Sequence, residues 1–249
     1  MPRMFDRIAH VYDLVYDYKT EDIEFYQDLA KKAGSPVLEL ACGTGRILIP
    51  IAREGVEITG IDLTENMLKV LKKKLSKENE RTRKNAEIMK GNMVDFRLGK
   101  FNMICLPFTS FFVLNKAEQK KCLKNVYDHL NPKGVFAMDA FNFDPNHPQN
   151  VMQHHNTVPY EGGYITKMAS NAREDRKQVM HVTFFYEIID RKGKVRKIIE
   201  KFDLHWVLPD QMKAMLKAAG FGKVSLYGDF DGGEFGKDSK TMVFIAEKS

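Results

Sequence analysis

The sequence has none of the features of a secreted, membrane-spanning or disulfide-bonded protein. Its cysteines are only three, Cys42, Cys105 and Cys122, and no Cys-x-x-Cys pair is present, so neither a disulfide framework nor a zinc site is indicated. No apolar run approaches the ~20 residues that a membrane span needs, and residues 1–6 carry an acid where a signal peptide has its apolar region. We therefore expect a cytoplasmic protein without membrane association.

Two phosphate-binding fingerprints are also missing. A Gly43-x-Gly45 turn follows the apolar run 37–40, but Leu48 stands where the dinucleotide fingerprint has its third glycine, and no Gly-Lys-Ser or Gly-Lys-Thr follows. A pyrophosphate-binding Rossmann enzyme and a Walker-type nucleotide site are both disfavoured. The turn still lets the backbone approach a ligand closely and leaves N–H groups free for an anionic group.

The composition indicates a globular protein with one unevenly charged region. The 249 residues are 43% hydrophobic and 29% charged, with a net charge of +6. Residues 69–100 hold 11 Lys and Arg against 4 Asp and Glu. This stretch indicates a basic surface that attracts nucleic acid or an anionic small molecule, although a solvated helix face and loop is the favoured interpretation.

Hydrophobic periodicity predicts a parallel α/β sheet followed by an antiparallel segment. Short apolar strands alternate with amphipathic helices up to residue 140, which favours a sheet covered on both faces. The predicted strands are 37–40, 57–61, 86–89, 101–106 and 134–140, and the main helices are 22–33, 45–54, a helix that Thr64 caps, and 116–130. A loop is expected over 141–159, then strands 164–169, 179–189 and 195–206, helix 209–219, and strands 223–227 and 241–247.

The second strand ends at Asp62, which is placed to accept hydrogen bonds from both hydroxyls of a ribose, although it also suits the start of the next helix. A ligand with a ribose and a carboxylate but no phosphate fits the turn and this acid together, and S-adenosylmethionine has both groups. Segments 39–45, 60–68 and 91–96 resemble, in this order, the cofactor motifs of class I S-adenosylmethionine-dependent methyltransferases.

The resemblance implies a Rossmann-like, seven-stranded, mostly parallel sheet with helices on both faces and an antiparallel β insertion after strand five. It implies a single methyltransferase domain over residues 1–249, in which an insertion over residues 143–206 is the substrate cap. Two positions depart from the family, because Asn92 and Asn102 stand where acids are usual, but the Asn92 carbonyl can still accept a hydrogen bond from adenine. The implied cofactor residues are Tyr12, Glu39, Ala41, Gly43, Gly45, Asp62, Leu63, Met67, Asn92, Met93 and Leu106.

The chemistry needs few residues, because methyl transfer from a sulfonium mainly requires alignment of a neutral nucleophile and exclusion of water. Tyr12, Tyr16 and His205 are weak catalytic candidates by position, and for each of them packing is the simpler role. His147, His154 and His155 have no carboxylate or cysteine spaced with them, so no metal is expected.

The insertion resembles that of the subgroup acting on small molecules, including sugar amines carried on nucleotides. No Asn/Asp-Pro-Pro-aromatic run or Pro-Cys pair is present, which disfavours methylation of nucleobases in DNA. The first hypothesis is therefore transfer of a methyl group to N or O of a small molecule. The alternatives are an RNA (tRNA) methyltransferase, suggested by the basic stretch, and a non-catalytic cofactor-binding regulator.

Overall fold

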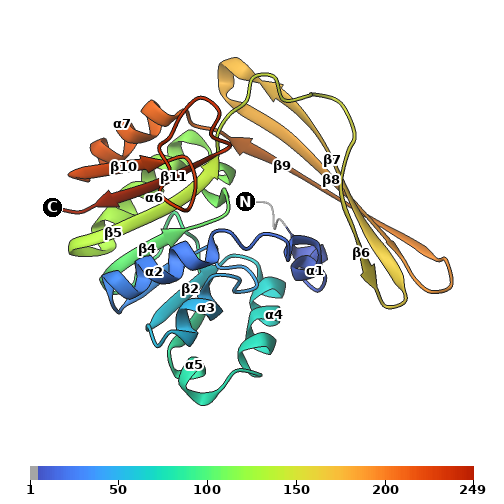
Figure 1. Ribbon diagram of the computed structural model, residues 1–249, viewed down its shortest axis with the longest axis horizontal. Coiled ribbons are helices and arrows are strands. Elements are labelled where there is room, and N and C mark those ends of the chain that lie inside the picture. Colours follow the sequence, from blue (N-terminus) through green and yellow to red (C-terminus); the bar gives the residue numbers. More distant parts are fainter. Residues whose placement is uncertain (1–4) are drawn as a thin grey trace.

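The computed structural model describes residues 5–249. Residues 1–4, which belong to the segment 1–6 compared above with a signal peptide, lie outside the described residues. Seven strands form the main sheet (Figure 1): β1 (Val37–Leu40), β2 (Ile58–Asp62), β3 (Ala86–Lys90), β4 (Phe101–Leu106), β5 (Leu130–Phe141), β10 (Lys223–Tyr227) and β11 (Thr241–Glu247). Their order is β10-β11-β5-β4-β1-β2-β3, and β11 runs antiparallel to both of its neighbours while the other pairs are parallel. The predicted sheet is confirmed.

Helices cover both faces of this sheet. They are α1 (Tyr12–Tyr16), α2 (Ile23–Ala33), α3 (Leu48–Arg53), α4 (Glu65–Leu75), α5 (Glu80–Lys84), α6 (Lys116–His129) and α7 (Pro209–Ala219), with 3-10 turns η1 (Asp6–Ile8), η2 (Ser110–Val113) and η3 (Asp175–Lys177). Tyr26, Ile51 and Leu71 bring α2, α3 and α4 into one core cluster, whereas Leu123 and Leu216 bring α6 and α7 into the other. No described helix is long and apolar enough to cross a membrane.

The segment between β5 and α7 forms a second sheet that stands beside the first and leans over α1 (Figure 1). Its strands are β6 (Gln153–Tyr160), β7 (Gly163–Glu174), β8 (Val179–Ile189) and β9 (Val195–His205), paired antiparallel in that order. We call this sheet the insertion sheet. It confirms the predicted antiparallel insertion after strand five.

One expectation in this region is wrong, because the predicted loop over 141–159 ends early in a strand. Residues Gln153–Tyr160 form β6 and pair with β7, with a register shift between His154 and Asn156. The sequence pattern did not indicate this strand, because histidines and Pro159 are unfavourable in the central strands of a sheet. They are tolerated here because β6 is an edge strand of its sheet.

The chain order of the main sheet reverses between β1 and β4, which lie side by side. Ligands of open parallel sheets bind at such a switch point, beyond the carboxyl ends of the strands. The turn after β1, the end of β2 and the loop after β4 all meet at this edge, and the insertion sheet lies beyond it.

Candidate active site

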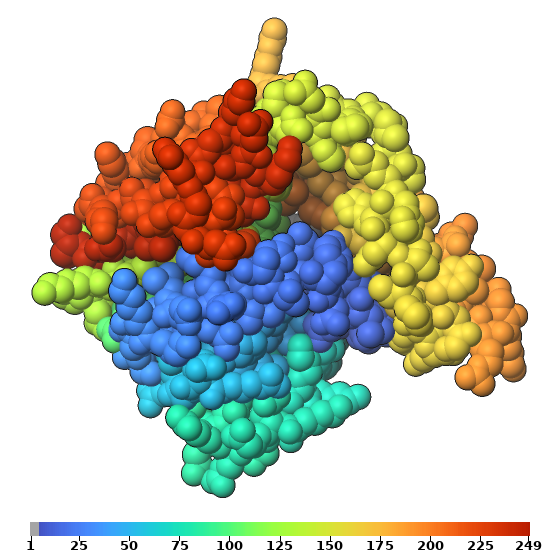
Figure 2. Space-filling model, in the orientation of Figure 1, coloured from blue at the N-terminus to red at the C-terminus, as the bar shows by residue number. Residues whose placement is uncertain are grey.

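A cavity of about 900 Å³ lies between the carboxyl edge of the main sheet and the insertion sheet. Figure 2 shows the surface hollowed between the blue N-terminal helices, the red C-terminal segment and the yellow-green start of the insertion. Residues from the turn after β1, from the end of β2, from α1 and from β7, β8 and β9 line the cavity. One continuous space therefore connects the predicted cofactor motifs with the insertion.

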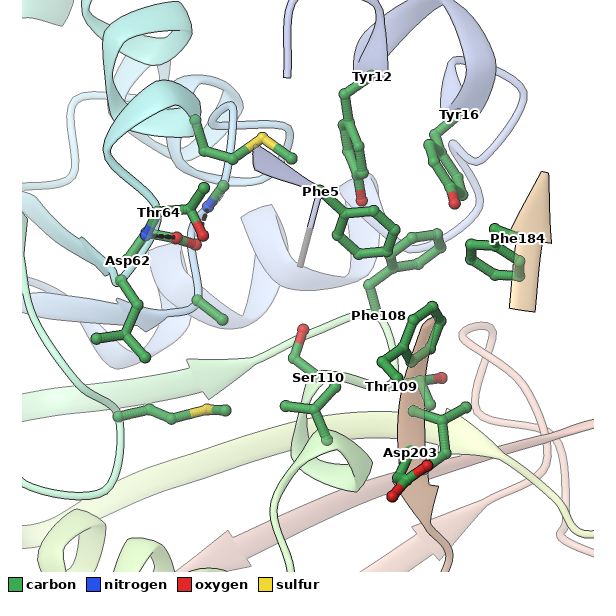
Figure 3. A pocket seen from close by; sticks show the side chains of 18 of the residues that line it. Phe5, Tyr12, Tyr16, Asp62, Thr64, Phe108, Thr109, Ser110, Phe184 and Asp203 are labelled. Atoms are coloured by element: carbon green, nitrogen blue, oxygen red, sulfur yellow. Dashed lines mark hydrogen bonds between the residues drawn. The ribbon is translucent and has the colours of Figure 1, made fainter. Parts of the chain in front are cut away.

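Asp62 ends β2 with its carboxylate held by two backbone donors, which are drawn in Figure 3. The Gly43 N–H donates to Oδ2 at 2.9 Å and the Thr64 N–H donates to Oδ1 at 2.7 Å. Burial raises the pKa of Asp62 above its usual value, while both hydrogen bonds lower it. Each oxygen retains acceptor capacity toward the cavity, because an ionised carboxylate accepts about four hydrogen bonds.

The cap that we predicted for α4 is not made as expected. Thr64 stands at the N-cap position, but its side chain accepts no capping hydrogen bond. The Asp62 carboxylate accepts a hydrogen bond from the Thr64 N–H instead, whereas its role toward a ribose stays a prediction.

The two glycines of the turn have different roles. Gly43 lines the cavity at φ +52°, and a Cβ there would meet no atom within 4 Å, so the glycine keeps space open beside the ligand. Gly45 does not line the cavity. Its φ is +81°, and a Cβ there would lie 2.3 Å from Cδ1 of Leu71, so this glycine serves the packing of α4.

Most of the predicted cofactor residues line the cavity: Tyr12, Ala41, Gly43, Asp62, Leu63, Met67 and Met93. Glu39, Gly45, Asn92 and Leu106 do not. Leu106 lies fully buried in the core. The Asn92 side-chain oxygen accepts a hydrogen bond from the Val94 N–H, which shapes the loop after β3.

Glu39 lies buried behind the glycine turn, where only 2% of it is exposed. Burial raises the pKa of its carboxyl group to about 8, against the opposing effect of the Arg46 guanidinium. Its Oε2 has no hydrogen-bond partner among the described residues. Glu39 does not line the cavity, and its implied contact with the cofactor stays a prediction.

Aromatic rings form the wall between the cofactor motifs and the insertion sheet (Figure 3). The rings of Tyr12 and Tyr16 stack at 4.5 Å, and Phe108 meets Tyr16 edge-on at 5.7 Å. Burial raises the pKa of both tyrosines, so both hydroxyls stay protonated at neutral pH. The Tyr16 ring stacks on Tyr12 and also lies 4.1 Å from the Lys167 amine.

Helix α1 is fixed over the turn by a single acid. Asp13 accepts hydrogen bonds from the Thr44 hydroxyl at 2.5 Å and from the Lys74 ammonium at 2.8 Å. These contacts connect α1 with the glycine turn and with α4, and they position Tyr12 and Tyr16.

The loop after β4 depends on a buried acid, Asp139, that the sequence reasoning missed. Phe108 and Thr109 both have positive φ, near +60°. The buried Asp139 accepts hydrogen bonds from the Phe108 N–H at 2.9 Å and from the Tyr26 hydroxyl at 2.7 Å. The guanidinium of Arg46 lies 4.9 Å from the Phe108 ring centroid. An acid inside the apolar strand 134–140 was the available signal for Asp139.

The remaining candidates divide between the cavity and the solvent. His205 and His155 line the cavity, as does Phe141, whereas His147 and His154 do not. Within residues 5–249 no group of His, Cys, Asp and Glu has the arrangement of a metal site.

None of the lysines and arginines of the basic stretch lines the cavity, and most of them lie on α4, α5 and β3. Several of its cations pair with acids, as Lys69 does with Glu65 and Lys84 with Glu80. The cationic residues that line the cavity are Lys19, Lys167 and Lys201 instead.

Comparisons with known proteins identify relatives of this chain. Residues 37–134 match a family model described as a methyltransferase domain. A glycine/sarcosine N-methyltransferase from Halorhodospira halochloris is 26% identical over 237 residues, covering 92% of this chain and 81% of the relative. A dTDP-3-amino-3,4,6-trideoxy-alpha-D-glucopyranose N,N-dimethyltransferase from Streptomyces venezuelae is 29% identical over 186 residues, covering 71% of this chain and 74% of the relative.

The fold is likewise shared with a solved S-adenosylmethionine-dependent methyltransferase from Clostridium acetobutylicum. The TM-score is 0.80 at 17% identity, over 98% of this chain and 99% of that one. Residues 37–134 therefore carry a class I S-adenosylmethionine-dependent methyltransferase domain. The protein is an enzyme that uses S-adenosylmethionine.

The residues present fit this cofactor. Asp62 has free acceptor capacity for ribose hydroxyls, Gly43 leaves open space, and Leu63, Met67 and Met93 offer apolar contacts for adenine. When bound, S-adenosylmethionine supplies an electrophilic methyl group on a sulfonium. The chain has to orient that group, exclude water and present a nucleophile.

Proposed function

We propose that the protein transfers a methyl group to a nitrogen or oxygen of a small molecule, and that the insertion over residues 143–206 is the cap of the acceptor site. The observation that carries the proposal is the single cavity shared by the two sheets. Asp62 and Gly43 line one part of it, and Lys167, Phe184 and Asp203 of the insertion sheet line another. A molecule bound beside the cofactor would contact the insertion.

The dimensions and lining of the cavity favour a small acceptor. About 900 Å³ is within the range of ligand sites, and it holds a cofactor together with a compact second molecule. The relatives named above are described as acting on glycine, sarcosine or an amino sugar. A sugar amine carried on a nucleotide, or an amino acid, is therefore the acceptor class to test first.

Label transfer tests the proposal directly. The protein is incubated with methyl-labelled S-adenosylmethionine and a metabolite extract, and labelled products are identified by mass. We expect a labelled small molecule, no transfer with Asp62→Ala, and unchanged transfer with the surface control Asp128→Asn. Label that appears only in the RNA fraction contradicts the proposal.

A further inference from the structure

Lys167 is a lysine on a buried face of the insertion sheet. On β7, the buried residues Ile165, Lys167 and Ala169 share the face that packs toward α1, and the half-buried Thr166 and Met168 lie between them on the other face. Only 3% of Lys167 is exposed. A charged group on a buried face requires a partner of opposite charge or loses its charge.

The amine of Lys167 has aromatic neighbours and no acid. Its Nζ lies 4.1 Å from the ring centroid of Tyr16 and 4.1 Å from that of Phe184. Between residues 5 and 249, no carboxylate forms a salt bridge with Nζ, and no group forms a hydrogen bond with it. Lys167 also lines the cavity, so its lone pair or its protons are available to a bound molecule.

Titratable groups surround Lys167 on each neighbouring element: Lys19 after α1, Tyr16 on α1, His155 on β6, Tyr186 opposite on β8, and Glu200 on β9. Burial first, and then the charge of Lys19, lower the pKa of Lys167 to about 7. The Tyr16 and Phe184 ring faces act in the opposite direction, because aromatic faces stabilise an ammonium. Glu200 lies two strands away, and the charges that act on it are those of Arg7 and Asp6.

We propose that Lys167 is the general base that removes a proton from a protonated amine acceptor, so that the acceptor class is a primary or secondary amine. The inference rests on the proposed function and narrows its acceptor. A proton moves from the acceptor ammonium to the lone pair of Lys167 Nζ. The freed acceptor nitrogen forms a bond to the methyl carbon, the methyl–sulfur bond breaks, and its electron pair stays on sulfur. Lys167 then releases its proton to water through the open cavity.

The geometry favours this role over two alternatives. A hydroxyl acceptor needs a stronger base than an amine that is half neutral near pH 7. The second alternative is that Lys167 binds a carboxylate or phosphate of the acceptor. That role needs a charged lysine, and both the apolar surroundings and the neighbouring Lys19 disfavour the charged form.

The first experiment measures the titration of Lys167 without any turnover. Trace acetic anhydride is added over pH 6–10 in the presence of S-adenosylhomocysteine, and acetylation of each lysine is quantified by peptide mass spectrometry. The exposed Lys121 on α6 is the internal reference. We expect the acetylation midpoint of Lys167 to lie at least two pH units below that of Lys121. Coincident midpoints overturn the proposal.

The second experiment compares Lys167→Met with Lys167→Arg, using methyl transfer to the metabolite extract described above between pH 6 and 9. Methionine preserves the apolar packing but removes the base, whereas arginine supplies a permanent positive charge and accepts no proton. We expect both variants to lose about 100-fold in rate at pH 7. The loss shrinks as rising pH deprotonates the acceptor in solution. Unchanged affinity for S-adenosylhomocysteine shows that both variants retain the site.

The outcomes separate the base role from the proposed function. Recovery of the rate by arginine identifies Lys167 as a binder of an anionic group and overturns the base role. Transfer at wild-type rate by both variants, or an O-methylated product, overturns it as well. If the wild-type protein labels nothing in any extract, the proposed function fails, and the base role fails with it.

Discussion

Replacement of Asp62 by asparagine tests the cofactor site with the smallest change of shape. The two carboxylate oxygens of Asp62 each accept a hydrogen bond from the backbone, one from Gly43 and one from Thr64. An asparagine amide has one oxygen and one NH₂ group. Whichever way it is oriented, its NH₂ faces a backbone N–H, and donor opposes donor.

The magnitude follows from the interactions lost. One charge-assisted hydrogen bond to the ribose is removed, worth about 1.5–3 kcal/mol, and one backbone donor loses its acceptor at a comparable cost in a partly buried site. Part of this cost is already present without ligand. We therefore expect binding to weaken by about 2–4 kcal/mol, which is roughly 30- to 1000-fold in Kd.

Calorimetric titration with S-adenosylhomocysteine measures the effect at pH 7.5. Asp128→Asn, on the exposed face of α6, is the matched control and should bind like the wild type. Thermal unfolding of both variants checks that they are folded. An Asp62→Asn affinity within about threefold of the wild type would refute the reasoning from the carboxylate.

Two further predictions concern the groups that support the site. Burial raises the pKa of Asp139 from 3.8 to about 6, so its protonated form stabilises the fold at low pH and that contribution is lost as the pH rises through 6. In Asp139→Asn the amide oxygen still accepts hydrogen bonds from Tyr26 and Phe108, but the side chain does not titrate. Between pH 4 and 7 the free energy of unfolding of the wild type should therefore fall by about 2 kcal/mol relative to that of the variant, as measured by urea unfolding. The same pH dependence of the unfolding free energy in both proteins would contradict this prediction. Asp22 accepts two hydrogen bonds from the Arg46 guanidinium, so Asp22→Ala should destabilise the fold by about 3 kcal/mol in urea unfolding. The double variant Asp22→Ala/Arg46→Met should recover most of that lost stability, because it no longer buries an unpaired guanidinium. If the double variant is as unstable as Asp22→Ala alone, the unpaired charge is not the cause of the loss.

The main sheet was predictable from the sequence because most of its strands are short, largely apolar runs that alternate with helices. Strand 37–40 is buried at every position and the glycine turn follows it, so the apolar run also indicates where the strand ends. The same pattern predicts Gly43 and Asp62 at one edge of the sheet, where the Gly43 N–H donates to the Asp62 carboxylate. Strand β6 was not predictable in this way, because a polar edge strand has no apolar pattern.

The acceptor side of the site depends on contacts between distant parts of the chain. Lys167 contacts Tyr16 of α1 and Phe184 of β8, and the sequence around Lys167 does not indicate either contact. Its spacing of two residues from Ile165 and from Ala169 places Lys167 on the same buried face of β7 as these apolar residues. Only the packing of α1 against the insertion sheet shows that this face borders the cavity.

A crystal structure with S-adenosylhomocysteine tests the central claim most directly. The account predicts both ribose hydroxyls within hydrogen-bond distance of the Asp62 carboxylate, with the sulfur facing the space between Tyr16 and the insertion sheet. A ligand bound elsewhere, or one whose ribose makes no contact with Asp62, would contradict it.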